Sequence, residues 1–587
     1  MAKKEKKFVW TRYERLYEHF GEMEFTFEEA LDYLKQFGDN KALLLRVFHE
    51  MDKQGLMEMR SLPEDRRKKM YRLKTLAETI GFKKSQDLTR QDLEGILKKA
   101  ADRIRTRVDY KFILILLFLK WLSDRREGEY EKAKKELIKA GLSEEEAEIE
   151  AKKKEFYTFY LPEECVWENI RKETTLLPEK LQKALKRISD FNPAFKGVVD
   201  SVEFIQFSNQ ENLMILKDLM EIFSARSLKD VSTDILGDAY EWILRYFAPQ
   251  KAKEGEIYTP REVIRLLVEM LTPDEFNTLK IFDPACGSGG MLIVADKYIK
   301  EKFGKAKAKK VFLNGQEANN VIYAICVMNL YLHEIMDAHI EIGDSLTNPR
   351  FVEDSALQKF DLILANPPWN QDGYGEVTLK NCKFWKEIYK YGFPTSQSAD
   401  WAWIQLMLAH TENDGKVGIV IDNGALFRGG REGNIRRKIL EEEDWIECVI
   451  LLPEKLFYNT GAPGAIIVFN KNKEKGRKNK ILFINASNEY ERHPEVRKLN
   501  RLGNSHIAKI VEAYKKFEEK DGFSRVVSLK EIKENDYNLN VTLYVYPEEK
   551  KEEIDIEKEW EELQKIEKEI TTIEQKIKGY LLSLIHI

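Results

Sequence analysis

The chain has 587 residues, too many for one hydrophobic core, so we expect about two to four domains. One third of the residues are charged with both signs mixed, and a formal net charge of −4 argues against a protein that coats nucleic acid unaided. Five scattered cysteines support neither a zinc site nor a disulfide framework, and no apolar run approaches the roughly 20 residues of a membrane span, so we expect a cytoplasmic protein without metal or membrane contact.

Residues 1–75 are predicted to form a small winged-helix-like module. Thr26 and Glu29 have the spacing of a capping box at the start of one helix, and a second helix follows and ends at Gly55. Residues 56–74 then resemble two short strands around a basic turn. Contact with a protein and contact with DNA are both compatible with this pattern, and the basic turn favours DNA only slightly.

Residues 76–225 are predicted to form an N-terminal helical domain, because their pattern is almost wholly helical. The apolar run FILILLFLKWL at 112–122 has charged flanks and is too short to span a bilayer. We interpret it as the buried central helix of this domain.

Residues 226–547 are predicted to form the catalytic domain. Helices alternate there with short apolar runs such as KIFDPACG, VFLNGQE and FDLILANPPW. That alternation is typical of an α/β fold with an open, mostly parallel sheet.

Residues 548–587 are predicted to form a C-terminal coiled-coil helix for subunit docking. Its apolar residues stand three and four apart among Glu and Lys, at Leu563, Ile566, Ile570, Ile573, Ile577 and Tyr580. A seam this narrow needs a second helix. The helix either folds back on the helical domain of its own chain or binds a partner subunit, and the pattern favours the partner.

The segment KIFDPACGSGGML indicates a ligand site at the end of a strand. It places Asp283 at the strand end, then a turn with Gly287, Gly289 and Gly290, then a helix that offers free N–H groups. The spacing matches neither phosphate-binding fingerprint, G-x-G-x-x-G or GK[ST]. Asp283 would repel a pyrophosphate and attract a cationic amino group, which favours a ligand with an amino-acid end.

Two further carboxylates end the next two predicted strands. Glu317 is placed to bind ribose hydroxyls, and Asp344 to accept a hydrogen bond from an adenine amino group. Each feature alone is weak, since a strand-end carboxylate is often only a helix cap. In order along successive strands they predict a nucleoside with an amino-acid end, which is S-adenosylmethionine.

The loop NPPW follows the strand FDLILA. The amide oxygen of Asn366 and the carbonyl of Pro367 can accept both N–H bonds of an adenine amine, turning its lone pair toward a methyl sulfonium, while the prolines remove donors and fix φ. Trp369 can stack on a base swung out of the duplex. The alternative is a helix-stop turn with a buried tryptophan.

These motifs resemble those of DNA adenine-N6 amino-methyltransferases, and most closely the modification (M) subunit of type I restriction-modification systems. That family has an N-terminal helical domain, then a segment like LGDAYEWILRYFA (236–248), then one like EIYTPREVIRLL (256–267), then the glycine-rich turn. The resemblance covers roughly residues 88–545. The first 70 or so residues depart from the family pattern.

The resemblance implies a Rossmann-like S-adenosylmethionine-dependent domain that methylates N6 of adenine in double-stranded DNA after base flipping. Cofactor binding would fall to Glu256, Ile257, Tyr258, Thr259, Pro260, Arg261, Asp283, Ala285, Gly287, Ser288, Gly289, Gly290, Glu317 and Asp344. Catalysis would fall to Asn366, Pro367, Pro368 and Trp369, and stacking on the flipped base to Trp369 and Phe457.

The resemblance also implies partners. In this family a specificity (S) subunit reads the target sequence, a restriction and translocation (R) subunit supplies the motor, and the complex contains a second copy of the M subunit. The chain agrees, because no P-loop and no long base-reading segment occurs in it.

Two other functions are compatible with the motifs. One is a different methyltransferase, acting on cytosine N4, on RNA or on a protein amide, since N-P-P loops also serve those substrates. The other is a scaffold with a methyltransferase fold but no turnover, against which the intact Asn366, Pro367, Pro368 and Glu317 argue.

Overall fold

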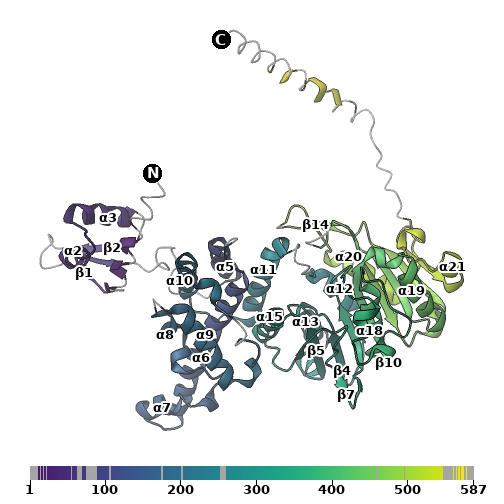
Figure 1. Ribbon diagram of the computed structural model, residues 1–587, viewed down its shortest axis with the longest axis horizontal. Helices are drawn as coiled ribbons and strands as arrows, with labels where there is room; N and C mark the ends of the chain where they lie inside the picture. The colour runs from purple at the N-terminus through teal and green to yellow at the C-terminus, as the bar shows by residue number, and fades with distance from the viewer. Residues whose placement is uncertain are drawn as a thin grey trace.

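The computed structural model describes residues 9–546 and separate residues between 560 and 577. It leaves out positions 10, 14, 18, 21–22, 54–55, 62–68, 74–88, 105–106, 174–175, 200–202, 230, 252–258, 458–460 and 495. Figure 1 shows the small N-terminal module, the helical part and the sheet-containing part following one another along the molecule.

Among the described residues, the N-terminal module includes the helices α2 and α3 and a three-stranded antiparallel sheet, with the strand order β1-β3-β2. Its elements are β1 (Phe25–Thr26), α2 (Phe27–Lys35), α3 (Lys41–Lys53), β2 (Met57–Ser61) and β3 (Lys69–Leu73). The predicted capping box is confirmed, since Thr26 Oγ1 accepts from the Glu29 N–H and the Glu29 carboxylate accepts from the Thr26 N–H. Most of the predicted basic turn lies outside the described residues.

The helical part is built around one long helix. The elements are α5 (Arg90–Ile104), α6 (Lys111–Lys139), α7 (Glu144–Glu150), α8 (Trp167–Arg171), α9 (Leu177–Phe191), α10 (Gln210–Ser224) and α11 (Thr233–Lys251). The whole of 112–122, at the start of α6, is buried, which confirms the interpretation of that run as a central helix. The same core continues onto α15 (Asn320–Leu332), so the helical part packs directly against the sheet-containing part.

The remaining chain forms a nine-stranded sheet with the order β16-β13-β11-β12-β10-β9-β4-β5-β6. The strands are β4 (Leu279–Asp283), β5 (Val311–Glu317), β6 (His339–Ile342), β9 (Phe360–Ala365), β10 (Thr411–Asp422), β11 (Ile446–Leu451), β12 (Gly464–Asn470), β13 (Lys480–Asn485) and β16 (Ser524–Ser528). All pairings from β6 to β10 are parallel, as is the pairing of β11 with β13. The predicted mostly parallel α/β sheet is confirmed.

Helices cover both faces of this sheet, which is why most residues of its central strands are buried. One face is covered by α12 (Arg261–Leu271), α13 (Gly290–Phe303) and α20 (Asn504–Lys516). The other is covered by α18 (Asp400–Ala409) and α19 (Gly430–Glu442), with the short α16 (Glu376–Leu379) and α17 (Trp385–Ile388). The smaller elements are α14 (Lys305–Ala308), α21 (Leu529–Glu534), β7 (Val352–Glu353), β8 (Ala356–Leu357), β14 (Glu491–Arg492) and β15 (Asn500–Arg501).

The strand order creates a switch point between β4 and β9. The chain runs from β4 outward to β5 and β6 on one side, then returns to place β9 on the other side of β4. Ligands bind at the carboxyl ends of strands at such a point, because the connections diverge there and leave a crevice. β4 ends at Asp283 and β9 ends at Ala365, next to Asn366.

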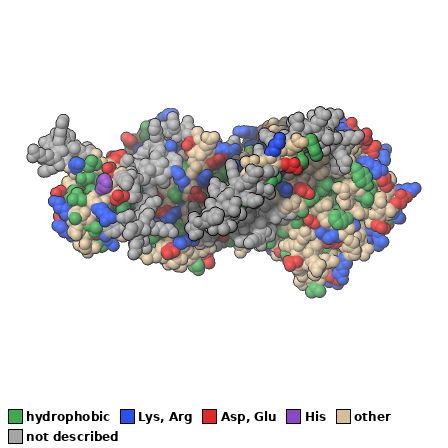
Figure 2. Space-filling view, turned by 90° about the horizontal axis from the view of Figure 1, so that it is seen from above, with side chains coloured by type: hydrophobic (Ala, Val, Ile, Leu, Met, Phe, Trp, Pro, Cys, Tyr) green, Lys and Arg blue, Asp and Glu red, His purple; other side chains and the backbone are tan. Residues whose placement is uncertain are grey.

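The described residues of the C-terminal tail are helical, and their apolar side chains are about half exposed from Leu563 to Ile577. Their docking partner therefore stays a prediction. Over the part of the chain that is described, no helix combines the length and apolar character needed to cross a bilayer. On the face seen in Figure 2, acidic and basic side chains are interspersed, in keeping with the formal net charge of −4.

Candidate functional site

The glycine-rich turn joins β4 to α13 at the switch point. The Asp283 carboxylate is 2% exposed and accepts a hydrogen bond from the Ala285 N–H at 3.0 Å. Gly289 is the N-cap of α13 with φ +83°, where a Cβ would also lie 3.1 Å from the sulfur of Cys326. Both its left-handed backbone and this close contact require glycine at position 289.

Burial changes the charge state of Asp283. It raises the pKa of this carboxyl to about 8, against an opposing contribution from the Ala285 N–H and with a smaller contribution from the nearby Glu317 carboxylate. At neutral pH the ligand-free carboxyl therefore holds its proton. A cation bound beside it would favour the ionised form and displace that proton.

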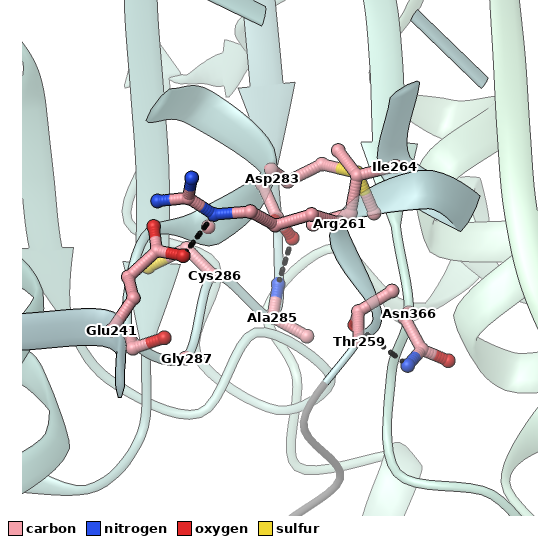
Figure 3. A pocket seen from close by; sticks show the side chains of 12 residues that line it. Glu241, Thr259, Arg261, Ile264, Asp283, Ala285, Cys286, Gly287 and Asn366 are labelled. Carbon is pink, nitrogen blue, oxygen red and sulfur yellow. Dashed lines mark hydrogen bonds and ion pairs between the residues drawn. The ribbon is translucent and has the colours of Figure 1, made fainter. Parts of the chain in front are cut away.

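A small pocket with a cavity volume of about 60 Å³ opens at this turn. Figure 3 shows its walls, which come from α11, from the start of α12, from the glycine-rich turn and from the loop after β9. The lining residues are Glu241, Thr259, Arg261, Ile264, Asp283, Ala285, Cys286, Gly287, Ser288, Gly290, Met291 and Asn366.

Most predicted cofactor residues that the structure describes meet here. Pro260 is buried as the N-cap of α12, beside the lining residues Thr259 and Arg261. Glu256, Ile257 and Tyr258 lie outside the described residues.

Glu317 and Asp344 do not line the pocket wall, although each ends a strand or follows one as predicted. Glu317 accepts hydrogen bonds from the N–H groups of Gly287 and Asn319. Asp344 accepts from the Leu346 N–H and from the hydroxyls of Thr347 and Tyr374. Their predicted contacts with ribose and adenine stay predictions.

Asn366 connects the loop after β9 to this pocket. Its side chain is 9% exposed, and its Nδ2 donates to Thr259 Oγ1 at 2.8 Å. Its Oδ1 accepts from the indole Nε1 of Trp369 at 2.9 Å. These two bonds fix which end of the amide is the acceptor, and one lone pair of Oδ1 is left for a further donor.

Trp369 packs on Phe457, with ring centroids 4.7 Å apart and planes at 67°. Phe457 is only 1% exposed, so its ring is a buried support behind Trp369 and presents no open face. The expectation that Phe457 forms a second wall for a base does not fit this geometry. The sequence placed Phe457 near the loop but did not show that it is covered.

The other end of the loop is anchored at Asn370, which has a left-handed backbone with φ +51°. Its N–H donates to Asp400 Oδ1 at 3.0 Å, and its side-chain oxygen accepts from Arg428 Nη1 at 2.8 Å. Arg428 also pairs with the fully buried Asp400 and with Glu432. The contact between Arg428 and this loop is not predictable from a local pattern, because Arg428 is 58 positions away from Asn370.

Comparison with known proteins identifies the family. Residues 231–553, more than half of the chain, match the family N-6 DNA Methylase. The chain is 44% identical to the type I restriction enzyme MjaVIII methylase subunit of Methanocaldococcus jannaschii, over 97% of this chain and 96% of that protein. The chain belongs to the methylase subunits of type I restriction enzymes.

Other matches agree with this family. Residues 93–223 match the HsdM N-terminal domain. The crystal structure of a type I restriction-modification methyltransferase subunit from Streptococcus thermophilus has a TM-score of 0.66 at 26% identity, covering 78% of this chain and all of that one. The resemblance inferred from the motifs is confirmed, and the chain is a methylase subunit of the adenine-specific DNA methyltransferase class.

Proposed function

We propose that this methylase subunit transfers a methyl group from S-adenosylmethionine to N6 of adenine in double-stranded DNA, after the base has been flipped out of the helix. The observation that carries the proposal is the hydrogen bond between Asn366 and Thr259, which joins the NPPW loop to the wall of the pocket. Acceptor groups for an amine thus lie beside a pocket suited to a cofactor.

The residues of the pocket fit S-adenosylmethionine. A buried Asp283, whose pKa is raised by burial, suits the ammonium of an amino-acid end. The guanidinium of Arg261 on the same wall suits its carboxylate. When bound, the cofactor supplies an electrophilic methyl group on a sulfonium.

The chain's own residues would position the nucleophile. Asn366 Oδ1, already oriented by the Trp369 indole, accepts one N–H of the adenine amine, and the carbonyl of Pro367 accepts the other. The amine lone pair then points away from both acceptors. Trp369, half-buried and supported by Phe457, is the remaining aromatic candidate for stacking on the base.

Part of the binding energy for DNA is expected to come from partner subunits. Flipping a base costs a few kcal/mol, and stacking on Trp369 returns about 1 to 3 kcal/mol. With a formal net charge of −4, the chain has little electrostatic attraction for DNA to supply the rest. We therefore propose a complex with a specificity subunit that reads the target, a second methylase subunit and a restriction subunit, in which the 548–587 helix docks on the specificity subunit.

Mass analysis of nucleosides tests the proposed reaction. Double-stranded DNA is incubated with the purified complex and S-adenosylmethionine, then digested to nucleosides. We expect N6-methyladenine to appear. N4-methylcytosine, or a methyl group found only on RNA or protein, would contradict the proposal, and cofactor binding without any transfer would indicate a scaffold.

Replacement of Gly464 tests the packing behind Trp369. A Cβ at position 464 would lie 2.7 Å from Phe457 Cε2 and 2.8 Å from Trp369 Cη2, so one of the rings must shift. We expect Gly464→Ala to lower kcat about tenfold to a hundredfold through misplacement of the loop. Affinity for S-adenosylmethionine, measured by calorimetry, should change less than about twofold. Gly461→Ala is the control, because a Cβ there meets nothing within 4 Å. Equal kcat for the two variants would show that Trp369 placement does not limit transfer.

The anchor at Asn370 gives a second test of loop position. Arg428→Lys keeps the charge but cannot bridge Asn370, Asp400 and Glu432 at once, because it lacks the planar fork of donors. We expect kcat to fall about tenfold with the cofactor affinity unchanged. Arg431→Lys, an exposed position three residues later at the start of α19, should leave both unchanged. The anchor is unimportant if Arg428→Lys keeps the wild-type kcat.

A further inference from the structure

An acidic residue from the helical part of the chain, Glu241, lies in the wall of the cofactor pocket. It belongs to α11 and is 3% exposed, and it lines the same pocket as Asp283 (Figure 3). No motif in the sequence assigns it a role in cofactor binding. It is therefore a buried carboxylate in the proposed active site whose function is open.

Close packing of helices brings Glu241 to this position. A Cβ at Gly237, one turn earlier on α11, would lie 2.2 Å from the ring of His333 at the end of α15. Only glycine allows α11 to approach α15 so closely. The next turn of α11 then presents Glu241 to Arg261 at the start of α12.

The two oxygens of Glu241 have different surroundings. Oε2 accepts from Nε of Arg261, whose Nη1 also donates to Asp238 at 2.9 Å. Oε1 is buried and accepts no hydrogen bond from the described residues, and the ring nitrogen of His333 is 3.8 Å from it. A buried carboxylate oxygen without a donor is unfavourable, so a ligand that donates a hydrogen bond here would relieve that cost.

The charges of the pocket wall match an amino acid. An amino-acid end carries an ammonium and a carboxylate, and the wall offers two carboxylates, Glu241 and Asp283, beside the guanidinium of Arg261. We propose that Glu241 is a cofactor-binding residue whose Oε1 accepts a hydrogen bond from the ammonium of S-adenosylmethionine, while its Oε2 keeps Arg261 directed at the carboxylate. The inference rests on the proposed function. It makes the helical part of the chain a component of the cofactor site.

Two ligands that differ in the amino-acid end test this assignment on the full-length chain. S-adenosylhomocysteine has that end, and 5′-deoxy-5′-methylthioadenosine lacks it, while both are neutral thioethers at the sulfur. We expect Glu241→Gln to weaken S-adenosylhomocysteine about tenfold or more, as for a lost hydrogen bond between charged groups. Affinity for methylthioadenosine, measured by the same calorimetry, should stay within about twofold of wild type.

Asp238→Asn is the matched control. Asp238 lies on the same helix and pairs with the same arginine, but it does not line the pocket. We expect this variant to bind both ligands like the wild type. A similar loss of affinity in Asp238→Asn and Glu241→Gln would overturn the inference, because it would show that both residues act only by positioning Arg261.

The outcomes separate the inference from the proposed function. A wild-type chain that binds no S-adenosylmethionine contradicts the proposed function and the inference together. If the wild type binds but Glu241→Gln binds equally well, or loses both ligands equally, Glu241 is not a ligand contact and the proposed function stands. Should Glu241→Gln not fold, Glu241→Asp replaces it, with a smaller but still selective loss expected and an unselective loss overturning the assignment.

Discussion

Asn366→Ala is expected to abolish methyl transfer while the chain still binds its cofactor. The substitution removes Oδ1, the acceptor that the Trp369 indole and Thr259 hold in place at the edge of the pocket. Loss of a preoriented hydrogen-bonding group that acts in the transition state costs about 10² to 10³ in rate. Because this asparagine also orients the loop through Trp369, we expect a loss of kcat of at least about 10³-fold.

Single-turnover transfer and equilibrium binding together measure this effect. Affinity for S-adenosylmethionine should stay within about threefold of wild type, since a group that acts mainly in the transition state contributes little to ground-state binding. Thr259→Val is the control for the orienting bond, because it removes the hydroxyl and keeps the shape of the side chain. We expect Thr259→Val to lower kcat less than Asn366→Ala does. Retained transfer in Asn366→Ala would remove Asn366 from its proposed role.

Asp283→Asn is expected to remove the pH dependence of cofactor binding as well as most of the affinity. The pKa of Asp283 is raised by burial to about 8 from its usual 3.8. Bound beside an ammonium, the carboxyl should ionise, so binding at pH 6 to 7.5 should release about one proton and strengthen about tenfold per pH unit. The ligand's own α-amino group stays largely protonated in this range, since its usual pKa is about 7.7 to 8.0.

The raised pKa of Asp283 also makes the stability of the ligand-free chain depend on pH. Between about pH 4 and pH 8 the folded state holds a proton that the unfolded state has lost, so this group's contribution to the free energy of unfolding falls as the pH rises. Asparagine cannot ionise, so Asp283→Asn should gain in Tm relative to wild type as the pH rises across this window. Its affinity for S-adenosylmethionine at pH 7.5 should fall about tenfold to a hundredfold.

Calorimetry in buffers of different ionisation enthalpy counts the released proton. The wild-type chain should release a proton on binding the cofactor below about pH 8 but not above it, and Asp283→Asn should release none at any pH. The same proton release in both proteins would show that another group ionises on binding.

Local patterns in the sequence were sufficient to predict the sheet and the residues at the ends of its strands. Asp283 ends a strand, Gly289 lies in a turn and Asn366 begins a loop. The geometry of each of these elements depends on residues that are neighbours in the sequence, so their positions could be predicted. The order of the strands then brings them together, because β4 and β9 are neighbours in a parallel sheet.

Contacts between distant segments were not predictable in this way. Glu241 reaches the pocket only because α11 packs on α15, and Arg428 anchors Asn370 from another element of the fold. The burial of Phe457 depends on β12, whose Gly464 leaves room for both aromatic rings. One signal was visible: Asp238 and Glu241 stand three apart on one helix, directly after Gly237.

We propose that the NPPW loop of this chain directs methyl transfer to adenine. The decisive experiment uses S-adenosylmethionine carrying a deuterated methyl group, incubated with double-stranded DNA and the complex containing either wild-type or Asn366→Ala methylase subunit. We expect deuterated N6-methyladenine from the wild-type complex and none from the variant, although both bind the cofactor. Label on N6 of adenine from the variant at the wild-type rate, or label on another base from the wild type, would overturn the proposal.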